Sequence, residues 1–128
     1  MKKNVLVDMS ATLLHHGHIN LLKKAAKYGN VIVALTTDLE IKKKKGYIPE
    51  INFSNRKKIL ESIKYVNKVV ASKWNIDDKF IKINDIQYLV HGSDEKNSCK
   101  NVKKIILKRT KNISSKMLRK KILKNEKK

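Results

Sequence analysis

The chain has 128 residues, 41% of them hydrophobic, which suffices for the core of one compact domain but not of two. Its 31 Lys and Arg residues against 11 Asp and Glu give a formal net charge of +20, which attracts phosphate-bearing ligands. No stretch approaches the roughly 20 apolar residues of a membrane span, and the start Met1-Lys2-Lys3 leads directly into a short strand-like segment, so we expect no secretory signal. We therefore expect a soluble cytoplasmic protein without membrane contacts, with one domain over residues 1–124 and a basic disordered tail over 125–128.

The positive charge comes almost entirely from lysine, because arginine occurs only as Arg56, Arg109 and Arg119. Arginine is the better bidentate reader of phosphates and bases, so its scarcity disfavours nucleic acid as the main ligand. The single cysteine, Cys99, has no Cys or His at zinc-ligand spacing. We expect it to be a buried or idle thiol, and we assign no metal-ligating residues.

The first elements in chain order predict a βαβ unit. Residues 4–9 form a mostly apolar run that is typical of a buried strand. Apolar residues then recur at helical spacing from Gly17 until Gly29, where we expect the helix to stop. Residues 31–35 are continuously apolar, which predicts a second strand that is buried on both faces and parallel to the first.

The segment 42–46, four lysines and a glycine, has no apolar periodicity and predicts a mobile loop over the edge of the sheet. Ser54 is the expected N-cap of the helix that follows. Five later segments complete the pattern, with strands at 68–71, 88–90 and 104–107, a short helix at 77–83, and a last helix from Ser114. This alternation predicts an α/β fold, a Rossmann-like, doubly wound, five-stranded parallel sheet in a three-layer sandwich.

The run His15-His16-Gly17-His18 stands where the first strand turns into the first helix. Gly17 has no side chain, so a phosphate can approach the backbone, and the free amides of a helix N-terminus attract anions. His15 and His18 are three residues apart and can present ring nitrogens to the same phosphate. Three histidines within four residues at such a turn favour a phosphate-binding site, with His16 as a spacer.

These residues resemble the HxGH motif of the cytidylyltransferase-like nucleotidyltransferases, and the likeness extends over residues 4–122. Residues 36–38 are similar to the family's Ser/Thr-x-Asp, and residues 55–61 to its Arg-bearing helix. Residues 109–115 are similar to its Arg-Thr-x-x-Ile-Ser-Ser/Thr motif. The likeness is greatest to members that act on glycerol 3-phosphate, which carry a tryptophan at the place of Trp74.

The resemblance implies transfer of CMP from CTP to a small phosphorylated acceptor, foremost glycerol 3-phosphate, giving CDP-glycerol and pyrophosphate without a covalent enzyme intermediate. It implies catalytic roles for His15, His18 and Arg109. The residues to which it assigns nucleotide binding are Met9, Ser10, Gly17, His18, Gly92, Asp94, Arg109, Thr110, Ile113, Ser114 and Ser115.

Acceptor binding is implied for Lys44, Lys45, Arg56 and Trp74. The resemblance further implies a Mg²⁺ ion on the phosphates, which offsets the charge of the triphosphate, and a homodimer.

Two features of the first strand's end depart from the resembled enzymes and keep alternatives open. Thr12 stands where those enzymes carry an aspartate close to the reacting phosphates, and residues 9–11 are similar to a subgroup associated with phosphonate-making mutases. The alternatives are cytidylyl transfer to a phosphonate, phosphocholine or phosphoethanolamine, and adenylyl transfer from ATP. A further alternative is a degenerate module that binds nucleotides or RNA without turnover.

Overall fold

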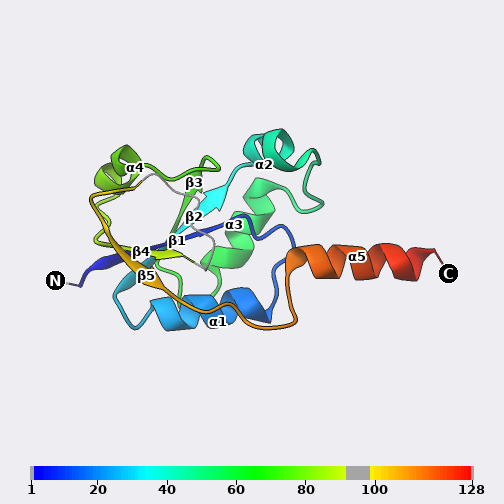
Figure 1. Cartoon of the computed structure of the whole chain (residues 1–128), viewed down its shortest axis with the longest axis horizontal. Coiled ribbons are helices and arrows are strands. Elements are labelled where there is room, and N and C mark those ends of the chain that lie inside the picture. The colour runs from blue at the N-terminus through cyan, green and yellow to red at the C-terminus, as the bar shows by residue number, and fades with distance from the viewer. Residues whose placement is uncertain (1, 92–98, 128) are drawn as a thin grey trace.

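The protein is described by a computed structural model, which covers residues 2–91 and 99–127. Five parallel strands form one sheet in the order β3-β2-β1-β4-β5. The strands are β1 (Asn4–Met9), β2 (Asn30–Thr36), β3 (Lys68–Ser72), β4 (Tyr88–His91) and β5 (Lys103–Ile106). The helices are α1 (His16–Ala25), α2 (Asp38–Lys45), α3 (Phe53–Glu61), α4 (Asp78–Ile83) and α5 (Ser115–Glu126). This arrangement confirms the Rossmann-like α/β fold (Figure 1).

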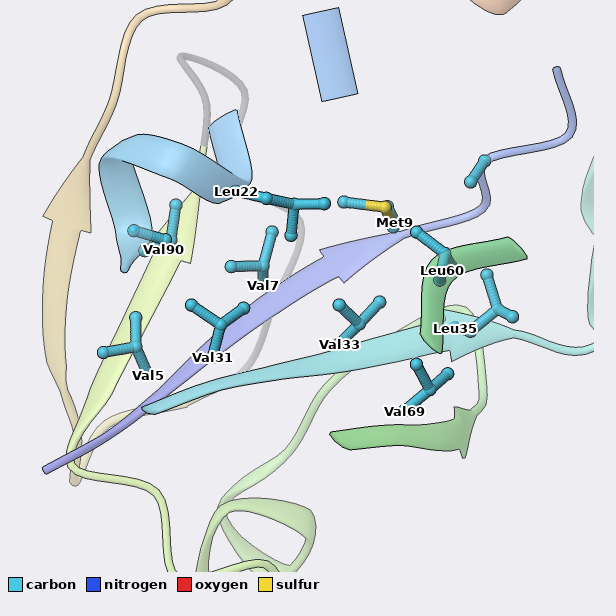
Figure 2. Packing of buried hydrophobic residues seen from close by; sticks show 12 residues of the cluster. Val5, Val7, Met9, Leu22, Val31, Val33, Leu35, Leu60, Val69 and Val90 are labelled. Carbon is cyan, nitrogen blue, oxygen red and sulfur yellow. The ribbon is translucent and has the colours of Figure 1, made fainter. Parts of the chain in front are cut away.

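Helices cover both faces of the sheet because the inner strands are apolar on both faces. On one face Val7 of β1 packs with Leu22 of α1 and Leu60 of α3, and all three side chains are buried (Figure 2). On the other face Leu6 packs with Ile81 of α4. Alternate residues of one strand therefore enter two separate cores, which explains the continuous apolar runs in the sequence.

Helix α1 ends earlier than the expected stop at Gly29, because Ala26 is its C-cap. Gly29 lies in the turn that leads into β2 and has a φ of +156°. A Cβ atom at this position would lie 2.1 Å from the carbonyl oxygen of Lys3. Gly29 is therefore required by the close approach of two backbone segments and not by the end of the helix.

The expected mobile loop over residues 42–46 is wrong, because residues 42–45 form the second half of α2. Thr37 caps the start of this helix, accepting a hydrogen bond from the amide of Glu40 at 3.4 Å. Gly46 ends it in the left-handed conformation, with φ at +79°. Ile41 is the buried residue of the helix, and a single buried residue among lysines leaves no apolar periodicity in the sequence.

The N-cap of helix α3 lies two residues before the expected N-cap at Ser54, because the helix begins at Phe53. The side chain of Asn52 caps it and accepts from the amide of Asn55 at 2.9 Å. Asn and Ser are comparably good caps, so their presence in one short segment made the choice ambiguous.

The guanidinium of Arg56, on α3, is 2% exposed and joins four segments of the chain. Its Nη1 donates to the carbonyl oxygens of Ser10, at 2.6 Å, and Thr36, at 3.0 Å. Its Nε donates to the carbonyl of Ile51 at 3.0 Å, and its Nη2 forms an ion pair with Asp38. The exits of β1 and β2 are thereby tied to the starts of α2 and α3.

The C-terminal helix continues to Glu126, two residues into the segment expected to be a disordered tail. None of the residues of α5 is buried, and the helix extends away from the sheet (Figure 1). No helix in the described ranges is both long and apolar enough to cross a membrane. Cys99 is buried as expected, and its thiol donates to the carbonyl oxygen of Ile76 at 3.3 Å.

We predict that Arg56→Ala lowers the free energy of unfolding by about 3 kcal/mol, measured by urea denaturation. The variant removes the donor that pairs with Asp38 and leaves the carbonyls of Ser10 and Thr36 without it. Lys58→Ala, at an exposed position of the same helix, is the control and should change stability by less than about 0.5 kcal/mol. Equal stability of the two variants would contradict the prediction.

Candidate active site

A cavity of about 230 Å³ opens beyond the carboxyl end of β1, between the start of α1 and the segment that leads into α5. This is the place where doubly wound sheets bind ligands. The residues that line it are Asp8, Met9, Ser10, Ala11, His15, Gly17, His18, Leu21, Arg109, Thr110, Ile113, Ser114 and Ser115. All the expected catalytic and nucleotide-binding residues that the structure describes are therefore brought together. The expected residues Gly92 and Asp94 lie outside the described ranges.

The rings of His15 and His18 cap the start of α1. The Nδ1 of His15, the N-cap residue, accepts from the amide of Gly17 at 3.0 Å. The Nδ1 of His18 accepts from the amide of His15 at 3.1 Å, which completes a capping box. Because a neutral ring that accepts at Nδ1 carries its proton on Nε2, each histidine retains one N–H donor.

Both histidines are held in their neutral form. Burial, and then the neighbouring His16, lower the pKa of His15. Burial, followed by the charges of His15 and Arg109, lowers the pKa of His18 from 6.5 to about 4. The unfolded chain therefore binds more protons than the folded chain between these pH values, so the stability that neutral His18 provides above pH 6.5 is lost as the pH falls toward 4.

Gly17 is required at the second position of α1. A Cβ atom there would lie 2.8 Å from Cε1 and 2.9 Å from Nδ1 of the His15 ring, and 3.2 Å from a methyl group of Ile113. Any side chain would displace the ring that caps the helix. The motif therefore depends on glycine for the placement of His15.

The second wall of the cavity is the start of α5. Ser114 is its N-cap and accepts from the amide of Met117 at 3.1 Å, so its own hydroxyl proton stays available to a ligand. The hydroxyl of Ser115 instead donates to the carbonyl of Leu13 at 2.9 Å. Ser115 can therefore offer its amide rather than its hydroxyl. Two helix N-termini, of α1 and α5, face one cavity, which suits a polyphosphate.

Asp8 lines the same cavity and was not among the expected site residues. Desolvation of its carboxyl group raises its pKa to about 6, although the positive charge of Arg109 acts in the opposite direction. Its signal in the sequence is that it is the one charged residue within the strand 4–9. Thr12, which stands in place of the resembled enzymes' aspartate, is 3% exposed and does not line the cavity.

The residues expected to bind the acceptor lie outside the lining of this cavity. Lys45 places its ammonium 5.4 Å from the centre of the Trp74 ring, so these two are brought together. The amide of Trp74 donates to Glu40 of α2 at 3.0 Å, and Lys44 is exposed beside Lys45. These contacts place a basic and aromatic cluster at the carboxyl ends of β2 and β3.

Arg56 was also expected to bind the acceptor, but its guanidinium lies in the interior and not in a solvent-accessible site. Its donors point to three backbone carbonyls and to Asp38. Arg56, which corresponds to the arginine of the family's Arg-bearing helix, therefore stabilises the segments that surround the site.

Comparison with known proteins agrees with this geometry. The family model described as Cytidylyltransferase-like matches residues 11–122, and the chain belongs to this family. A glycerol-3-phosphate cytidylyltransferase of Staphylococcus aureus is 38% identical over 121 residues, 88% of this chain and 89% of its own length. An ethanolamine-phosphate cytidylyltransferase of Dictyostelium discoideum is 32% identical over 92 residues, 70% of this chain and 25% of its own length.

Among solved structures, a lipopolysaccharide core biosynthesis protein of Thermoplasma volcanium has the same fold. It superposes with a TM-score of 0.69 at 18% sequence identity, and the match covers 88% of this chain and all of that one.

We predict that His15→Asn lowers kcat/KM about 10²- to 10³-fold, because it removes the Nε2 donor from the cavity. Asparagine is a good N-cap, so the helix start and the melting temperature should be preserved. The control is His16→Asn, since His16 is exposed and lies outside the cavity. Equal activity of the two variants in a steady-state assay would remove His15 from the mechanism.

Proposed function

We propose that this chain transfers CMP from CTP to glycerol 3-phosphate and releases pyrophosphate, giving CDP-glycerol. The observation that carries the proposal is the single cavity in which the HxGH turn and the 109–115 segment meet. The full-length similarity to glycerol-3-phosphate cytidylyltransferases supports it. A relative from Bacillus spizizenii, for example, is 35% identical over 92% of this chain and 95% of its own length.

In the proposed reaction an oxygen of the acceptor's phosphate attacks the α-phosphorus of CTP in line. The bond from that phosphorus to the bridging oxygen of the β-phosphate breaks, and pyrophosphate leaves with the electron pair. The Nε2 donors of His15 and His18 hold the oxygens on which negative charge develops. Arg109 and the amides at the start of α5 hold the pyrophosphate portion. Catalysis then consists of positioning and charge stabilisation, without a nucleophilic side chain.

The cluster of Lys45 and Trp74 favours glycerol 3-phosphate over a cationic acceptor. The ammonium of Lys45 lies over the indole face, where a choline or ethanolamine head group would gain cation–π attraction. A second cation beside Lys45 would be repelled. The same ammonium is well placed to attract a phosphate that carries an uncharged glycerol group.

Phosphoethanolamine remains the second candidate acceptor, because a phosphoethanolamine enzyme is among the relatives. The Glu40 carboxylate is the feature that would favour it, since it accepts a hydrogen bond from the backbone amide of Trp74 and so lies close to this residue. It also pairs with Lys43 at 3.8 Å. Its charge is thus already partly compensated, which makes this candidate weaker.

We predict pyrophosphate release with CTP and glycerol 3-phosphate in the presence of Mg²⁺, and at least tenfold slower release with each alternative pair. The assay crosses CTP and ATP against glycerol 3-phosphate, phosphocholine, phosphoethanolamine and 2-hydroxyethylphosphonate. Faster release with phosphocholine or phosphoethanolamine would contradict the inference that Lys45 disfavours a cationic acceptor. If no pair releases pyrophosphate and the protein binds nucleotides or RNA in a salt-sensitive way, the noncatalytic alternative is favoured.

We also propose that a Mg²⁺ ion bound to the triphosphate is held on the protein side by Asp8. No group of three or more potential metal ligands is assembled within residues 2–91 and 99–127, so the phosphates would supply most of the coordination. Asp8 is the acidic residue among the described cavity-lining residues, and Mg²⁺ commonly binds one carboxylate together with substrate phosphates. When bound, the ion offsets phosphate charge.

We predict that Asp8→Asn weakens Mn²⁺ binding to the complex of protein and CTP about tenfold, because an amide oxygen is a weaker ligand than a carboxylate. Electron paramagnetic resonance of free Mn²⁺ measures this without turnover. Asp85→Asn, on the opposite side of the domain from the cavity lining, serves as the control. Unchanged Mn²⁺ binding in Asp8→Asn would contradict a role of Asp8 as a metal ligand.

The resemblance also implies a homodimer, and we propose that state for this chain. Sedimentation velocity at micromolar concentration would show twice the mass of 14.8 kDa, and a single species of 14.8 kDa would refute it. We further propose a cytoplasmic location, in keeping with the lone reduced cysteine.

A further inference from the structure

Helix α5 is attached at its start to the segment that carries the histidines. The hydroxyl of Ser115 donates to the carbonyl of Leu13 at 2.9 Å and accepts from the amide of the same residue at 3.4 Å. Leu13 lies two residues before His15. The first turn of α5, which faces the cavity, is thus bound to the chain just before the HxGH turn.

One helical turn later, Arg119 binds the segment between α2 and α3. Residues four apart lie on the same side of a helix, so Arg119 follows Ser115 along one face. Its Nη1 donates to the hydroxyl of Tyr47 at 3.0 Å, and its Nη2 donates to Glu50. Its guanidinium carbon lies 4.3 Å from the centre of the Tyr47 ring.

The contact with Tyr47 makes this attachment more than a surface ion pair. The Glu50 side chain is 61% exposed, and an exposed ion pair contributes little by itself. The Arg119 side chain is only 21% exposed, because the tyrosine ring covers one face of the guanidinium. The hydrogen bond from Arg119 lowers the pKa of Glu50, so the pair is ionised at neutral pH.

Polar attachments matter for α5 because apolar burial does not hold it. None of its residues, all of which the structure describes, is buried. Met117, Ile122 and Leu123 are each about half exposed or more. A helix held in this way can change its position at low cost when a ligand binds at its N-terminus.

We propose that Arg119 is a positioning residue that couples nucleotide binding to acceptor binding, an inference that rests on the proposed function. A triphosphate at the N-terminus of α5 fixes the first turn of the helix. Arg119 then fixes residues 46–50. These residues directly follow Lys44 and Lys45, which are expected to bind the acceptor. Since coupling is reciprocal, glycerol 3-phosphate strengthens CTP binding by the same factor.

Hydrogen exchange with CTP alone tests this coupling without turnover. In the wild type we expect CTP to slow amide exchange at residues 114–118 and also within residues 46–50, where all residues but Pro49 carry an amide hydrogen, each at least fivefold. In Arg119→Ala the protection at 114–118 should remain and that at 46–50 should be lost. The control is Lys120→Ala, which removes an exposed positive charge from the same helix turn and should retain both effects.

Steady-state kinetics provide a second readout that a merely structural contact would not change. In the wild type the KM for glycerol 3-phosphate should fall about fivefold between low and saturating CTP. In Arg119→Ala it should become independent of CTP while kcat at saturation of both substrates is retained. Arg119→Lys keeps the charge but loses the planar stacking and the forked contact, so it should not restore the coupling.

Protection at 46–50 that persists in Arg119→Ala would overturn this inference. So would protection confined to 114–118 in the wild type, although the proposed function would stand. Absence of CTP protection at 114–118 in the wild type would overturn the proposed function, and this inference with it.

Discussion

The buried guanidinium of Arg56 is the contact on which the shape of the site depends. Four backbone or carboxylate oxygens converge on it from separate segments. Those of Ser10 and Thr36 lie where β1 and β2 end, and those of Asp38 and Ile51 lie at or just before the starts of α2 and α3. The bond to Ser10 fixes the direction of the chain only five residues before His15. A lysine would supply the charge but not the planar set of donors, so the geometry depends on arginine itself.

The sheet and the HxGH turn that lines the cavity could be predicted because their signals are local. The apolar runs at 4–9 and 31–35, and a glycine between histidines, need no knowledge of distant residues. The helical conformation of residues 42–45 could not be predicted, because Ile41 is the one buried residue of α2. The burial of Arg56 could not be predicted either. Its oxygen partners come from segments up to 46 residues away and become neighbours only in the folded protein.

In the proposed function the site would meet a polyanion with two neutral donors beside the charged Arg109, although the chain has a net charge of +20. His15 and His18 use one ring nitrogen to cap α1, which fixes the tautomer, and burial keeps both rings uncharged. Neutral donors of fixed orientation discriminate by geometry, whereas surface lysines attract any phosphate. In the proposed reaction the lysines would concentrate anionic ligands near the protein, and the histidines would select the orientation in which one can react.

Cys99 provides the folded protein with an internal reporter of breathing motions. Burial, with the carboxylate of Asp78 as the next cause, raises the pKa of its thiol to about 11. The nucleophilic thiolate is therefore scarce at neutral pH, and the sulfur is shielded between α4 and the sheet. Electrophilic reagents can modify it only when that layer opens, so the rate of alkylation measures how often the α4 side of the molecule separates from the strands.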